Sequence, residues 1–135
     1  MQRAARFGDG WMPYMYTPEM LAESLTQIAR HAATAGRPAD AVRPGLFVFT
    51  CCHADGTRAR EMAIARLSAQ YAQDFSKIAD RYVVMGDPAE CRRRLQQYVD
   101  AGARTIFLSS ACPSEYLEAN ETLLAREVLP AFRGA

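Results

Sequence analysis

The clearest pattern of apolar and polar positions lies between residues 87 and 100. Asp87 stands at an N-cap position and Glu90 follows three residues later, so each side chain is expected to accept a hydrogen bond from the other residue's amide. Four apolar residues then repeat at helical spacing: Cys91, Leu95, Tyr98 and Val99. The pattern predicts a helix from Pro88 to Asp100 with one buried side.

A short apolar run follows this helix. Gly102 suits a left-handed helix end, and residues 104–109 are rich in types that favour strands. A capped helix, a tight turn and a strand form the αβ half of a βαβ unit.

Three further helices are predicted. Thr17 is a candidate N-cap of a helix that Gly36 ends, and a second helix runs from residue 57 to about 74 or as far as 80. A last helix lies near residues 116–132. Residues 82–84 are expected only to connect the second of these helices to the helix at 88–100.

Two more segments have the pattern of strands. Residues 45–52 are apolar on both faces, which indicates a strand covered on both sides. Residues 10–12 form a short strand, because Pro13 takes the backbone out of the sheet. With residues 104–109 these make about three strands, and right-handed crossovers through the helices would place them in parallel.

Three parallel strands with outer helices neither close a barrel nor cover their inner face. The predicted fold class is therefore α/β: a partial (βα) TIM barrel, or a small open layer that must associate. No linker or repeat divides residues 1–135, so we expect a single domain. Residues 1–6 read as the end of a helix, and we expect that a preceding segment or a partner supplies the rest.

Composition narrows the function classes. The content of 50% apolar and 23% charged residues is typical of a globular protein, and the net charge of +1 does not favour nucleic acid as a partner. No apolar run approaches the roughly 20 residues that span a bilayer, so we expect no membrane contact and a cytoplasmic location.

The four cysteines are expected to be reduced, since none has the Cys-x-x-Cys spacing. Cys51, Cys52 and His53 are consecutive, and consecutive strand residues point to opposite faces. We therefore expect no metal site there.

Two motifs carry a family resemblance. Arg3-Ala-Ala-Arg-Phe-Gly-Asp-Gly-Trp11 comes first, and Gly86-Asp-Pro-Ala-Glu90 with Asp100-Ala-Gly-Ala-Arg-Thr-Ile-Phe-Leu108 comes later. Both resemble segments of the luciferase-like monooxygenases, which are flavin- or deazaflavin-dependent TIM barrels. Their order and separation also resemble that family.

The resemblance implies the C-terminal part of an eight-stranded barrel. It implies an FMN or deazaflavin cofactor and an oxidoreductase or monooxygenase that transfers hydride or activates oxygen on a small organic substrate. The early strands and a glycine-rich phosphate-binding stretch would lie outside this sequence. We therefore expect a homo-oligomer or a partner that carries the missing barrel half, and the alternative is a catalytically incomplete fragment that acts only through such assembly.

Candidate site residues follow from barrel geometry, because barrel active sites lie at the carboxyl ends of the strands. Trp11 and Tyr14 are candidates to line a flat cofactor, with packing as the alternative. His53 is the candidate catalytic residue, because histidine is the side chain that titrates near neutral pH, and a structural role is the alternative. Ser109 and Ser110 are candidate donors to a phosphate or carbonyl, with loop capping as the alternative.

Overall fold

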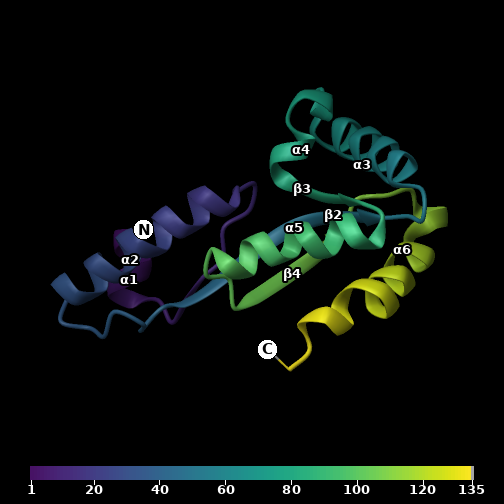
Figure 1. Ribbon diagram of the computed structural model, residues 1–135. Helices are drawn as coiled ribbons and strands as arrows, with labels where there is room; N and C mark the ends of the chain where they lie inside the picture. Colours follow the sequence, from purple (N-terminus) through teal and green to yellow (C-terminus); the bar gives the residue numbers. More distant parts are fainter. Residues whose placement is uncertain (135) are drawn as a thin grey trace. The chain divides into compact units, whose positions relative to one another are not determined.

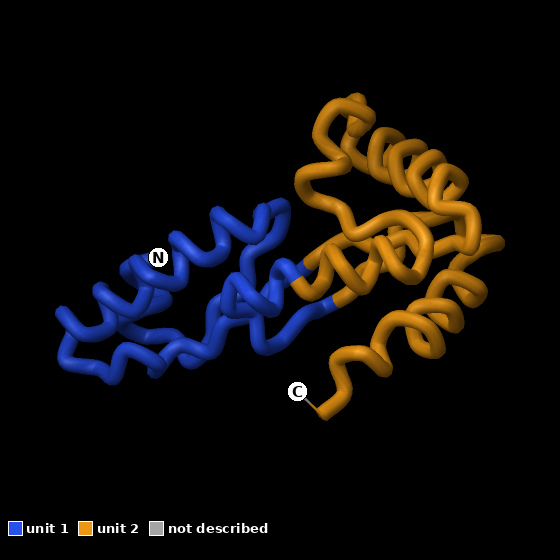
Figure 2. Tube along the Cα trace, in the orientation of Figure 1, with its two compact units in different colours: residues 1–47, 97–107 blue, residues 48–96, 108–135 orange. Residues whose placement is uncertain are grey.

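The longest strand, β2 (Arg43–Cys52), is the common element of a four-stranded sheet. Figure 1 shows the computed structural model, which describes residues 1–134. These residues form two compact units (Figure 2): residues 1–47 with 97–107, and residues 48–96 with the chain from residue 108 onward. We call them unit 1 and unit 2. The chain crosses from one unit to the other at three places. One lies within β2, one within α5 (Pro88–Asp100), and one within β4 (Thr105–Ser110), between residues 107 and 108.

The strands pair in parallel with β2. In unit 1 the short strand β1 (Gly10–Trp11) pairs with the start of β2, and in unit 2 the strand β3 (Val83–Gly86) pairs with its end. Strand β4 also pairs with β2. The amide of Arg104 donates to the carbonyl of Pro44 at 3.0 Å in unit 1, and the amide of Ala111 donates to the carbonyl of Thr50 at 2.8 Å in unit 2.

Unit 1 is built around two helices, α1 (Gln2–Phe7) and α2 (Pro18–Thr34), which contact each other. The predicted N-cap of α2 is confirmed, because the hydroxyl of Thr17 accepts a hydrogen bond from the amide of Met20 at 3.3 Å. The apolar core of this unit contains four buried side chains: Ala5, Ile28, Ala32 and Val42. Burying this apolar surface is what stabilises the helix pair against β1 and β2.

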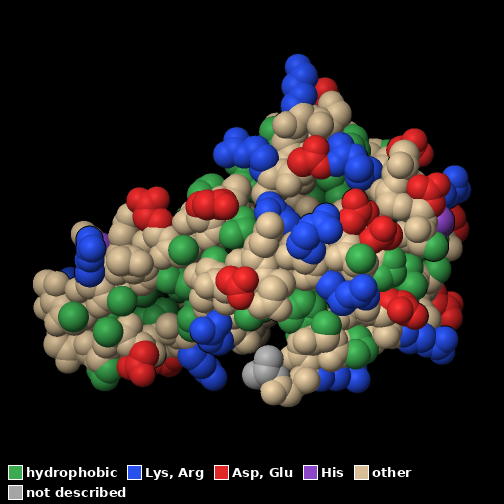
Figure 3. All heavy atoms as spheres, viewed as in Figure 1, with side chains coloured by type: hydrophobic (Ala, Val, Ile, Leu, Met, Phe, Trp, Pro, Cys, Tyr) green, Lys and Arg blue, Asp and Glu red, His purple; other side chains and the backbone are tan. Residues whose placement is uncertain are grey.

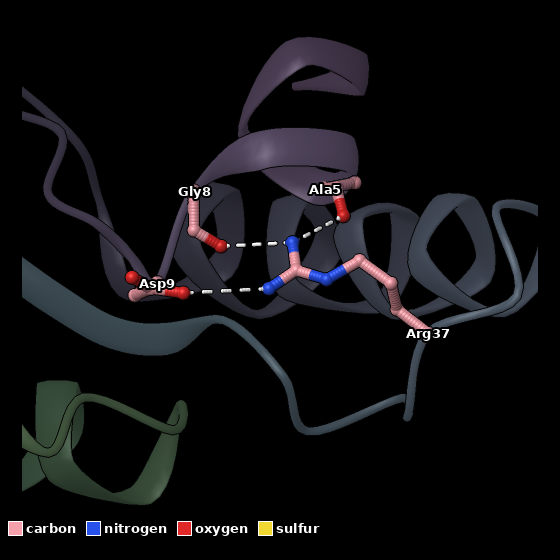
Figure 4. Close-up of polar contacts among 4 residues, drawn as sticks. All are labelled: Ala5, Gly8, Asp9 and Arg37. Atoms are coloured by element: carbon pink, nitrogen blue, oxygen red, sulfur yellow. Dashed lines mark hydrogen bonds and ion pairs between the residues drawn. The ribbon is translucent and has the colours of Figure 1, made fainter.

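One arginine fixes the end of α1 (Figure 4). The guanidinium of Arg37 donates to the carbonyls of Ala5 at 2.8 Å and Gly8 at 2.9 Å, and it forms an ion pair with Asp9 at 3.5 Å. The last carbonyls of a helix have no partner within the helix. Arg37 supplies that partner and so holds the segment that leads into β1.

Unit 2 contains the remaining helices. They are α3 (Gly56–Tyr71), a 3₁₀ turn (Phe75–Lys77), α4 (Ala79–Tyr82), the first part of α5, a 3₁₀ turn (Ser114–Tyr116), α6 (Leu117–Leu123), a π-helical turn (Leu124–Val128) and a 3₁₀ turn (Leu129–Phe132). Among the described residues, every helix is too short or too polar to cross a bilayer.

The predicted start of α5 is confirmed. The amide of Asp87 donates to Glu90 at 2.8 Å, and the amide of Glu90 donates to Asp87 at 2.9 Å. At the other end, Gly102 has a φ of +113°, as the predicted helix end requires. Local sequence signals therefore define both limits of this helix.

The α/β class and the mostly parallel sheet are confirmed, and three predicted details differ. Residues 83–86 form a strand rather than a connection, because β2 offers them a parallel partner over four residues. The helix from residue 57 ends at Tyr71, because Ala72 takes a left-handed conformation (φ 49°). The last helix does not continue to residue 132 as one α-helix but passes through π and 3₁₀ turns before and around Pro130, which lacks an amide hydrogen.

Candidate functional site

The carboxyl ends of three strands meet in unit 2. The amide of His53, just after β2, donates to the carbonyl of Gly86 at the end of β3 at 3.1 Å. The amide of Ala111, just after β4, donates to Thr50 on β2 at 2.8 Å. The sequence analysis predicted His53, Ser109 and Ser110 at this edge.

The last residue of β2 is held by two side chains from the C-terminal part of the chain. The side-chain oxygen of Asn120 accepts a hydrogen bond from the amide of Cys52 at 2.7 Å, and the hydroxyl of Tyr116 donates to the carbonyl of Cys52 at 2.7 Å. Asn120 is fully buried. Both backbone groups of a buried strand end are therefore satisfied, which avoids the cost of an unpaired polar group.

Asn120 also links β2 to β4. Its amide nitrogen donates to the hydroxyl of Ser110 at 3.0 Å, and that hydroxyl donates to Glu121 at 3.5 Å. The hydroxyl of Ser110 thus uses its proton within this network. The carbonyl of Ser109 accepts from the hydroxyl of Thr50 at 3.5 Å.

The imidazole of His53 is held in one orientation. Its Nδ1 atom accepts a hydrogen bond from the amide of Asp55 at 2.9 Å, and its ring packs on Tyr116 with 5.3 Å between the ring centroids. A neutral imidazole that accepts at Nδ1 carries its proton at Nε2. In this arrangement Nε2–H is a hydrogen-bond donor.

Burial and a contact between two thiols shift the pKa values of other groups at this edge, and the hydrogen bond with Cys91 lowers the pKa of Cys52. Burial raises the pKa of Cys51 to about 12, and it also raises the pKa of Cys112 and of Tyr116. A hydrogen bond with the Cys52 thiol, together with burial, raises the pKa of Cys91. Cys51, Cys91 and Cys112 therefore stay protonated at neutral pH, which makes them poor nucleophiles.

All four cysteines are buried, free thiols. Within residues 1–134, no group of three or more histidine, cysteine or acidic side chains has the arrangement to hold a metal ion.

On the face of the molecule seen in Figure 3, acidic and basic side chains are interspersed.

The other predicted site residues lie in unit 1. Trp11 packs against the apolar core of that unit and makes an edge contact with Tyr16, with 5.6 Å between the ring centroids. Tyr14 is 56% exposed and contacts Phe47 edge-on at 6.4 Å. The structure therefore joins His53 and Ser110 through Tyr116 and Asn120, whereas Trp11 and Tyr14 belong to the other unit.

The sequence reasoning missed Tyr116 and Asn120 as residues of this site. One signal was present, because Asn120 lies three residues after Leu117 and four before Leu124, on the apolar side of the predicted helix. A polar residue in such a stripe has to find a buried partner. The partner itself, 68 positions away in the sequence, carries no local signal.

A pocket lies elsewhere in unit 1. It has a volume of about 310 Å³ and is lined by residues of α1 and α2 and by the residue after α2: Gln2, Arg6, His31, Thr34 and Ala35. It contains none of the predicted site residues.

Solved structures resemble this chain over 97–98% of its length. A coenzyme F420 dependent tetrahydromethanopterin reductase from Methanopyrus kandleri has 16% identity and a TM-score of 0.73, with 48% of its chain covered. A monooxygenase from Streptomyces bottropensis has 22% identity, a TM-score of 0.70 and 44% coverage. An F420-dependent secondary alcohol dehydrogenase has 14% identity, a TM-score of 0.78 and 45% coverage.

The chain thus spans less than half the length of each of these structures. No curated protein matches it in sequence. The family model of the luciferase-like monooxygenases matches residues 1–105, which is most of the chain. The fold similarity and this match agree with the two motifs at residues 3–11 and 86–108. The chain belongs to the luciferase-like monooxygenase family.

Proposed function

We propose that this chain is the C-terminal part of a flavin- or deazaflavin-dependent oxidoreductase that transfers hydride or activates oxygen on a small organic substrate. The observation that carries the proposal is the ordered polar edge in unit 2, where His53 presents Nε2–H at a strand end in a chain of this family. Two of the similar structures are F420-dependent enzymes and one is a monooxygenase, which supports a redox function.

The donors at this edge fit the oxygens of an FMN or deazaflavin cofactor. Nε2–H of His53 is directed by the Asp55 amide and the Tyr116 ring, and Ser109, whose carbonyl accepts from Thr50, adds a hydroxyl at this edge. The cofactor supplies the redox chemistry when it is bound. The chain's part is to orient it through these donors, and Asn120 and Tyr116 keep the strand end in place.

A second candidate function rests on how little of each similar structure the chain covers. Because the chain covers less than half of each similar structure, it also fits a catalytically incomplete segment that acts through a second copy or through a partner with the remaining barrel. In that case the edge described above completes a site only after assembly.

Titration of the purified chain with FMN and with the deazaflavin coenzyme tests the proposal. We expect measurable quenching of the cofactor's fluorescence, and we expect His53→Ala to weaken binding while His31→Ala, at the unit 1 pocket, does not. Light scattering in the same samples gives the oligomeric state. The self-sufficient enzyme is rejected if neither cofactor binds at high micromolar concentration, and the assembly-dependent segment then remains.

A further inference from the structure

The unit 1 pocket, of about 310 Å³, is formed by one side of α1 and one side of α2. Gln2 and Arg6 are four positions apart on α1, so their side chains lie on the same side of that helix. His31, Thr34 and Ala35 are three and four positions apart at the end of α2 and share a side in the same way. The small side chain of Ala35 leaves room for a ligand.

The charges that line the pocket are positive. Arg6 carries a guanidinium, His31 carries an imidazole that is cationic when protonated, and no carboxylate lines the pocket. Among residues 1–134, neither of these two side chains takes part in an ion pair. The guanidinium of Arg6 lies over the ring of Phe7, 5.3 Å from its centroid, which restrains it without neutralising it. Both cations are therefore available to an anion from solution.

Cations near the end of a helix often serve the helix itself, because they bond to its last carbonyls. In this unit those carbonyls have other partners. The carbonyls of residues 30–33 on α2 accept from the hydroxyl of Thr34 and from the amides of residues 35–37. The carbonyls at the end of α1 accept from the guanidinium of Arg37 (Figure 4). Neither helix end therefore requires the cations of the pocket.

The donors that remain fit a small oxyanion. The planar guanidinium of Arg6 matches two oxygens of a phosphate or carboxylate, and the imidazole of His31 and the amide of Gln2 add further N–H groups. The hydroxyl of Thr34 already donates to a carbonyl, so it is not counted. Pockets for small molecules span roughly 300–1,000 Å³, and a volume at the lower limit suits inorganic phosphate better than a whole flavin nucleotide.

We propose that the unit 1 pocket is a binding site for a small phosphate-like oxyanion, which Arg6, His31 and Gln2 hold. The pocket shares no residue with the strand edge of unit 2 that carries the proposed function. The inference goes beyond that function and does not depend on it.

The test is an NMR titration of the nitrogen-labelled full chain with inorganic phosphate, at constant ionic strength and at a pH of about 6, where histidine is largely protonated. We expect saturable shifts of the amides that line the pocket. Arg6→Gln and His31→Gln should each weaken binding by about threefold to fivefold, as for an exposed charge contact. Arg30→Gln is the matched control, because it removes a positive charge from an exposed position of α2 outside the pocket, and it should leave the affinity unchanged.

Four results would overturn the proposal. They are no saturable shift at the pocket, an affinity of Arg6→Gln equal to that of the wild type, an equal loss in Arg30→Gln, and displacement of phosphate by FMN, which would assign the pocket to the cofactor. Thermal unfolding shows whether each variant is folded. If Arg6→Gln is not, Arg6→Lys replaces it with the same expected loss, because lysine lacks the planar fork. A failure of FMN to bind leaves this site standing, so the two proposals are tested separately.

Discussion

The Nδ1 atom of His53 accepts a hydrogen bond from the backbone amide of Asp55. Because an amide can only donate, this contact fixes the neutral imidazole as the tautomer with its proton at Nε2. Asp55 is also the N-cap of α3, where its carboxylate accepts from the amides of Thr57 and Arg58. The start of this helix and the orientation of the histidine therefore depend on one short segment.

The first prediction concerns that tautomer. Nitrogen NMR of the imidazole-labelled chain should show His53 protonated at Nε2 and not at Nδ1 when the ring is neutral. His31, the other histidine, provides the reference signal, and His53→Gln assigns the resonances. A dominant Nδ1–H form would contradict the orientation described.

Asn120 should be a main contributor to the stability of the strand end. In Asn120→Ala the buried amide of Cys52 loses its partner and Ser110 loses its donor, so we expect a loss of about 2–3 kcal/mol in the free energy of unfolding. Urea denaturation measures this loss. Glu118→Ala, on the exposed side of α6, is the control and should change stability by less than about 0.5 kcal/mol.

Two glycines with positive φ allow a matched comparison. Gly36 (φ +74°) has open space around it, whereas a Cβ on Gly86 (φ +140°) would lie 2.8 Å from the Cβ of Glu90, whose carboxylate caps Asp87. An alanine at Gly36 takes a conformation near the left-handed region, which costs about 1 kcal/mol, whereas the φ of +140° at Gly86 lies well outside that region and costs about 1–3 kcal/mol. We expect Gly86→Ala to lose about a further 1–3 kcal/mol from crowding, and equal losses in thermal unfolding would contradict this account.

The raised pKa of Cys51 predicts a pH dependence of stability. Between its ordinary value of 9.0 and about 12, the folded chain keeps a proton that the unfolded chain has lost. The stabilisation is therefore complete below pH 9 and declines as the pH rises toward 12. Denaturation from pH 8 to 11 should show a shallower decline for Cys51→Ala than for the wild type, and parallel curves would argue against a buried thiol.

Features that depend on nearby residues were predictable from the sequence. The reciprocal cap of Asp87 and Glu90 and the glycine end of α5 each involve residues within a few positions of one another. The left-handed Ala72 was not predictable, because it has no glycine signal and depends on the turn in which Phe75 bonds to the hydroxyl of Ser68.

Features that depend on distant partners could not be predicted. In the sequence, residues 83–86 are only a short apolar run, and it is their pairing with β2 that makes them a strand. His53 and Ser110 were placed at strand ends from the pattern alone, but the network that joins them needs Tyr116 and Asn120. The order of the strands was thus enough to predict where the site lies. Its polar contacts could be identified only in the tertiary structure.

The support of Cys52 by Tyr116 and Asn120 has a consequence for how unit 2 folds. These contacts span 64 and 68 positions, so on a ribosome the end of β2 leaves the exit tunnel long before its partners are synthesised. Contacts of such long sequence separation slow folding and leave intermediates exposed. The amide and carbonyl of Cys52 therefore gain these two side-chain partners only after α6 and the turn before it have been synthesised.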